Sequence, residues 1–144
     1  MTLNNFGSLL GFSLEIETQN AVFFADAATA PQCEPARAVF EALAKNSRKR
    51  IKEIERTRRE NVTEMILENL EGFTKAPFVR DPGDPKALAR DEVIATAEEL
   101  LKRSIRFYAE AGPKLKRLPE VAGALKRLAK KSKRDAEQIA GLQG

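Results

Sequence analysis

Apolar side chains recur at helical spacing in four stretches of the chain, and this pattern predicts an all-α protein. In the first stretch, Leu9, Ile16 and Phe23 stand seven residues apart, so they share one face of a helix. Prolines and glycines lie between the stretches, where they end one helix before the next begins. The expected helices cover residues 4 or 5 to 29, a stretch from just after Pro35 to 71, residues 86–111 and residues 118 or 119 to 139.

One long irregular segment divides the four expected helices into two pairs. Residues 73–85 hold three of the seven prolines of the chain, together with Gly83, whereas the connections within each pair are short. Long helices joined by short connections form antiparallel hairpins. We therefore expect a single domain over residues 1–144, with one hairpin at about 4–72, a crossover at 73–85 and a second hairpin at about 86–141.

The two hairpins share an internal repeat that indicates a duplication. Residues 43–54 reappear as residues 128–139, with Leu, Ala, Lys, Ser and Ile recurring at an offset of 85. A second set recurs at an offset of 84, with Phe24 opposite Tyr108. Its members are Glu15, Phe23, Ala25 and Ala27 in the first hairpin and Glu99, Phe107, Ala109 and Ala111 in the second.

These repeated halves resemble the rubrerythrin branch of the ferritin-like di-iron bundles. In that family each half supplies one Glu and one Glu-x-x-His to a pair of iron ions. The resemblance implies a ferritin-like four-helix bundle made of two duplicated antiparallel hairpins with a long crossover. It also marks six ligand positions, which this chain fills with Glu17, Leu101, Ser47, Arg50, Ser132 and Asp135.

Most of these positions have lost the groups that bind iron. Only Glu17 and Asp135 still carry a carboxylate, and the chain contains no histidine. Arg50 has a guanidinium that is always charged, so it would repel a metal ion. We therefore expect no di-iron cofactor and no metal site; if a metal were held, Glu17 and Asp135 would be its ligands.

Arg50 also suggests what replaced the metal. If it faces inward, it would pair with one or both of the carboxylates of Glu17 and Asp135, because a buried carboxylate without a partner is costly. In the alternative, Arg50 lies outside and Glu17 takes a proton or a water molecule. The other expected members of this polar network in the core are Asn20, Ser47, Ser104, Tyr108 and Ser132, whereas Leu101 is a lost ligand position without a polar group.

Composition and charge limit the kinds of partner that the chain is expected to bind. The chain is 42% hydrophobic and 32% charged, which is typical of helices with charged surfaces, and its net charge of +4 is mild. Basic residues cluster in the second and fourth helices, but acidic residues lie among them and no aromatic residues interleave. This pattern favours solvated helix faces over a nucleic-acid partner. No run of about 18 apolar residues predicts a membrane span.

The single cysteine, Cys33, excludes a disulfide within one chain and fits a reducing cytoplasm. We interpret it as an inert thiol in a loop, with a reactive or disulfide-forming thiol as the alternative. No basic stretch precedes the first apolar residues, so we do not expect a signal peptide. We therefore expect a cytoplasmic location.

An apolar stripe continues along the second helix past the reach of the first. We expect a homodimer that buries this stripe, with the link at residues 74–85 as the alternative cover. The expected interface residues are Val62, Met65, Ile66, Leu70 and Phe73.

The leading prediction is a non-catalytic ferritin-like bundle that has lost its di-iron centre and acts as a binding or interaction module. The alternative is a metal-binding or redox protein of the rubrerythrin kind with a rearranged carboxylate site. That site would combine Glu17 and Asp135 with Glu98 or Glu99. A second alternative is a basic bundle that binds nucleic acid or another polyanion. The sequence indicates no particular small-molecule ligand.

Overall fold

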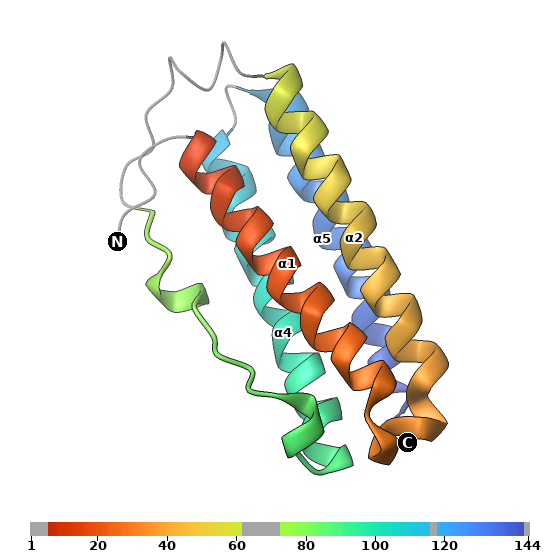
Figure 1. Ribbon diagram of the computed structural model, residues 1–144. Coiled ribbons are helices and arrows are strands. Elements are labelled where there is room, and N and C mark those ends of the chain that lie inside the picture. The colour runs from red at the N-terminus through yellow and green to blue at the C-terminus, as the bar shows by residue number, and fades with distance from the viewer. Residues whose placement is uncertain (1–5, 62–72, 116–117, 143–144) are drawn as a thin grey trace.

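The computed structural model describes residues 6–61, 73–115 and 118–142. Within these residues it has four α-helices, which confirms the all-α prediction. We use the labels of Figure 1. The helices are α1 (Phe6–Thr29), α2 (Arg37–Glu60), α4 (Arg90–Ala111) and α5 (Pro119–Ala140).

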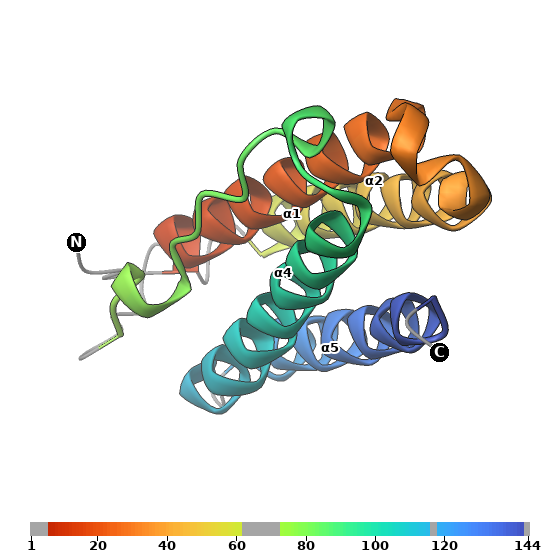
Figure 2. The same cartoon turned by 90° about the horizontal axis from the view of Figure 1, so that it is seen from below.

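The helices form two antiparallel pairs, α1 with α2 and α4 with α5, and the pairs pack through α1 against α4 and α2 against α5 (Figure 2). The chain runs down α1 and up α2, and later up α4 and down α5 (Figure 1). Because α2 and α4 point the same way, the segment between them has to travel the length of the bundle. Its described part lies along α1 and α4, as Figure 1 shows in green.

Short 3₁₀ helices shape the connections. They are η1 (Pro31–Ala36), η2 (Ala76–Phe78), η3 (Pro85–Ala87) and η4 (Gly112–Leu115). The first helix ends at Thr29 as expected, and Pro119 takes the first position of α5, where its missing N–H is not needed. The expected extension of the second helix to residue 71 falls outside the described residues.

The third helix begins later than the sequence predicted. We expected a start at residue 86, but α4 begins at Arg90. The Asp84 side chain accepts a hydrogen bond from the Lys86 N–H and stabilises the separate turn η3, after which Leu88 is extended. The Glu92 side chain then accepts from the Ala89 N–H, which caps the start of α4.

Two apolar clusters fill the bundle, and a polar layer separates them along every helix. One cluster includes Ile16, Ile54, Phe107 and Leu128. The other includes Phe23, Leu43, Leu101 and Ile139. Twelve polar or charged side chains among the described residues are also buried. Between the two clusters in sequence lie Glu17, Asn20, Ser47, Arg50, Ser104, Ser132 and Asp135.

The crossover contributes two buried aromatic side chains to the core. Phe73 and Phe78 stack with ring centroids 5.9 Å apart, and Phe78 meets Phe107 of α4 edge-on at 5.2 Å. Phe73, which we expected in a dimer interface, is thus 5% exposed and covered within its own chain. Val62, Met65, Ile66 and Leu70, the other expected interface residues, lie outside the described residues.

None of the helices in the described ranges is both long enough and apolar enough to pass through a membrane.

Candidate functional site

Arg50 lies at the centre of the polar layer, and its side chain is hydrogen-bonded on every nitrogen. Nε donates to Glu17 Oε1 at 3.0 Å and Nη1 to Asp135 Oδ2 at 2.7 Å. Nη2 donates to Ser47 Oγ at 3.0 Å, one helical turn earlier on α2. Arg50 is 1% exposed, Glu17 0% and Asp135 2%. One guanidinium therefore joins α1, α2 and α5 inside the protein.

The charge of Arg50 is held in place by its two partners. Burial opposes the charged form, but the carboxylates of Glu17 and Asp135 outweigh it and raise the pKa of Arg50 above its usual value. The guanidinium is therefore a permanent cation between two acids.

Tyr108 binds the second oxygen of Glu17. Its hydroxyl donates to Glu17 Oε2 at 2.5 Å and accepts from Ser13 Oγ at 3.2 Å. Burial of the phenol, followed by the charge of Glu17, raises the pKa of Tyr108 well above its usual value. The hydroxyl therefore stays protonated and acts as a donor.

Asp135 is likewise satisfied on both oxygens. Asn46 Nδ2 donates to Asp135 Oδ1 at 2.9 Å, which leaves Arg50 with the other oxygen. Nearby on α5, Ser132 is buried, and its Oγ has no hydrogen-bond partner among the described residues. Sequence reasoning missed Asn46, although it lies one turn before Arg50 on the same face of α2.

A second buried arginine, Arg103 on α4, extends the polar layer and was not foreseen. Its Nη2 donates to Asn20 Oδ1 at 2.8 Å and its Nη1 to Gln19 Oε1 at 2.6 Å. Asn20 Nδ2 in turn donates to Ser104 Oγ at 2.9 Å. The helical spacing of residues 100, 103 and 107 on the inner face of α4 was the available signal.

The positive charge of Arg103 is stabilised by fewer neighbouring groups than that of Arg50. No carboxylate within the described residues pairs with it, and its Nε is buried without a partner. Burial lowers the pKa of Arg103 to about 10, and the nearby charge of Glu17 opposes this shift. Two buried cations and two buried carboxylates nevertheless balance one another across the layer.

Two other acids considered for a rearranged metal site lie elsewhere. Glu99 pairs with Arg80 at 2.7 Å on the surface, and its side chain is 58% exposed. Glu98 pairs with Lys102 at 2.8 Å. The structure thus brings Glu17 and Asp135 together through Arg50 and leaves Glu98 and Glu99 out.

The donor set of the polar layer does not fit a di-iron centre. All four carboxylate oxygens of Glu17 and Asp135 accept hydrogen bonds from protein donors. The Arg50 guanidinium lies between these two acids, and its positive charge would repel a metal ion there. No cluster of three or more His, Cys, Asp or Glu able to hold a metal occurs in the described part of the chain.

Cys33 lies in η1 and is fully buried. Burial raises the pKa of its thiol, and the positive charge of Arg90 opposes the shift only in part. A buried thiol with a raised pKa is poorly nucleophilic.

Comparison with known proteins found no matching family model, no matching curated protein and no matching solved structure.

Proposed function

We propose that this chain is a non-catalytic bundle of the ferritin-like, rubrerythrin type, in which a fixed arginine replaces the metal ions. The observation that carries the proposal is Arg50 between Glu17 and Asp135, 3.0 Å from one carboxylate and 2.7 Å from the other. Buried carboxylates need a cation, and a guanidinium supplies that charge without redox chemistry. The bundle then serves as a binding or interaction module.

The contacts between the two hairpins support descent from a duplication. Around a two-fold axis, residues near the axis meet their own equivalents. Arg50 bonds Asp135 at a separation of 85 residues, which is the offset of the repeat containing both. Asn20 bonds Ser104 at a separation of 84, the offset of the other repeat. Such pairing of equivalent positions favours two related halves packed face to face.

The path of the chain supports the ferritin-like part of the proposal. A simple up-and-down bundle would join α2 to α4 by a tight turn, and these helices would then be antiparallel. Here α2 and α4 run in the same direction, and the crossover returns along the bundle (Figure 1). A single long crossover of this kind is the mark of ferritin-like bundles.

Metal analysis tests the loss of the di-iron centre. We expect protein purified from iron-supplemented cells to hold far less than one equivalent of iron, manganese or zinc per chain. Two chelatable equivalents per chain, lost in Glu17→Gln and Asp135→Asn variants, would refute the proposal. That outcome would support the alternative of a metal-binding or redox protein. A surface variant, Glu41→Gln, is the matched control and should leave the metal content unchanged, because its side chain is 56% exposed.

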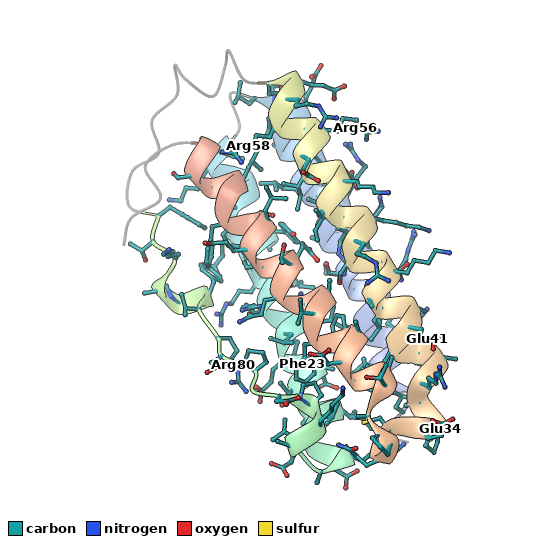
Figure 3. The ribbon with its side chains drawn as sticks, viewed as in Figure 1. Phe23, Glu34, Glu41, Arg56, Arg58 and Arg80 are labelled. Carbon is teal, nitrogen blue, oxygen red and sulfur yellow. The ribbon has the colours of Figure 1, made fainter. Side chains whose placement is uncertain are left out.

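A second candidate function is polyanion binding on the face shared by α2 and α5. Two adjoining hollows of about 350 and 490 Å³ lie there and share Lys49 and Lys131. Side chains on this side of α2, such as Arg56, point away from the bundle (Figure 3). The cations lining the two hollows are Lys49, Lys52, Arg56, Arg59, Lys131 and Arg134, with Arg50 at the floor of one of them.

Duplex DNA titrated at several salt concentrations tests this second candidate. Binding should weaken steeply with salt, and a Lys49→Glu, Lys52→Glu, Arg56→Glu variant should lose most of it. Undetectable binding at low salt would exclude the polyanion function.

We also propose a homodimer, which rests on the apolar stripe of residues 62–70. Sedimentation velocity at tens of micromolar decides this point, because a monomer at that concentration would refute it.

A further inference from the structure

A pocket between the end of α4 and residues 122–133 of α5 has mostly apolar walls. It encloses about 450 Å³, a volume within the range of roughly 300–1,000 Å³ that is typical of small-molecule sites. Helix α5 contributes two small side chains, Ala122 and Ala129, and the turn after α4 contributes Gly112 and Pro113. Because these residues are small, neighbouring side chains do not fill the space between the helices.

Three lysines of α5 line the same pocket: Lys126, Lys130 and Lys133. Their spacing of four and three residues places them on one face of the helix. Two lysines elsewhere on the surface have acidic partners, Lys102 with Glu98 at 2.8 Å and Lys131 with Glu53 at 2.8 Å. Within residues 6–61, 73–115 and 118–142, no ion pair involves any of these three lysines. The pocket therefore combines apolar walls with three positive charges for which the described residues supply no ion-pair partner.

We infer that this pocket binds an amphipathic anion, meaning a carboxylate attached to an apolar chain of medium length. A neutral apolar ligand would leave the three ammonium groups without a counter-charge. A highly charged polyanion would leave the apolar walls in water. An acyl carboxylate meets both demands, since its chain packs against the walls and its head group reaches the lysines.

The pocket ends on Tyr108, which is 1% exposed. The phenol hydroxyl donates to Glu17 in the polar layer, so Tyr108 links this layer to the lining of the pocket. The chain has one tyrosine and no tryptophan. Intrinsic tyrosine fluorescence therefore reports on one residue, and that residue lies at the floor of the pocket.

This inference goes beyond the proposed function and does not depend on the loss of metal. Titration of the full-length protein with decanoate, followed by Tyr108 fluorescence and checked by calorimetry, tests it. We expect a saturable change with one site per chain. Decanol, decyltrimethylammonium and acetate are the comparison probes, because each lacks the negative charge or the apolar chain. Decanol and decyltrimethylammonium should bind roughly tenfold more weakly or worse, because neither can pair with the lysines. Acetate should also bind at least roughly tenfold more weakly, because it has no apolar chain to bury against the walls.

Two variants locate the site. Lys126→Glu, Lys130→Glu, Lys133→Glu reverses charges at exposed positions and should weaken decanoate binding by about tenfold or more. Lys49→Glu, Lys52→Glu, Arg56→Glu makes the same charge change on α2 and should bind like the wild type. Ala129→Leu, which fills the pocket without altering charge, should also weaken binding, with far-UV circular dichroism confirming that it is folded.

Several results would overturn the inference. One is the absence of a saturable change in Tyr108 fluorescence. Another is equal binding of decanoate and decyltrimethylammonium. A third is loss of binding in the α2 variant but not in the α5 variant. Vesicles of anionic phospholipid form the last arm of the experiment. Binding to vesicles without binding to monomeric decanoate would mean that the lysines recognise a membrane surface and not a ligand in the pocket.

Discussion

Replacing Arg50 by methionine should strongly destabilise the protein. Methionine keeps an unbranched apolar side chain but removes all three donated hydrogen bonds and both ion pairs. Glu17 and Asp135, which are 0% and 2% exposed, then remain buried without their ion-pair partner. Breaking a buried pair in this way costs about 3–5 kcal/mol. That is a large part of the roughly 5–15 kcal/mol that stabilises a domain.

Neutralising Glu17 and Asp135 should reverse the loss of stability caused by Arg50→Met. In the triple variant Glu17→Gln, Arg50→Met, Asp135→Asn, no buried charge is stranded at these three positions. The hydrogen bonds from Tyr108 and Asn46 still have amide oxygens to bind. We expect most of the lost stability to return, because whole buried ion pairs contribute little net free energy compared with neutral replacements.

Urea unfolding followed by far-UV circular dichroism measures these effects, with the slope checked for constancy between variants. Lys131→Met is the matched control, since it removes a lysine whose side chain is 48% exposed in its pair with Glu53. That change should cost under about 1 kcal/mol. In a double-mutant cycle, Glu17→Gln and Arg50→Met should couple by at least about 1 kcal/mol. A coupling of zero, or an Arg50→Met variant as stable as the control, would refute this account of the core.

The other predictions concern buried groups outside that pair. Tyr108 should not ionise in the folded protein near its usual pKa of 10.0. Its contribution to stability is therefore fully present below pH 10 and is lost as the pH rises through the folded pKa. The absorbance of tyrosinate should show this, with a lower apparent pKa in Glu17→Gln. Cys33 should react with a thiol reagent only on unfolding, because burial closes access and raises the pKa of its thiol; fast labelling of native protein would contradict this. Phe78→Ala should cost about 3–5 kcal/mol in urea unfolding, since the ring is 2% exposed and packs on α4; a loss under 1 kcal/mol would show that the crossover is not part of the core.

Local pattern was enough to predict most of the helices. Residues three, four and seven apart share a helix face whatever surrounds them, so the apolar spacing along α1 and α5 indicated helices directly. The start of α4 was misjudged because Asp84 caps a separate turn, a local hydrogen bond that competes with helix formation. The sequence also contained the reasons to expect Arg50 near Glu17 and Asp135, since all three lie on inward faces.

Only the packing of the helices decided which polar groups meet. Arg103 and Asn46 lie on faces whose burial depends on a neighbouring helix, and nothing in their own segments says which helix that is. The partners of Arg103, Gln19 and Asn20, are more than 80 residues away in the chain. A long flexible side chain can reach several such groups, and the choice among them depends on helix spacing and rotamer. Periodicity along the chain therefore determined which faces turn inward, and tertiary structure determined which side chains of different helices share a hydrogen bond.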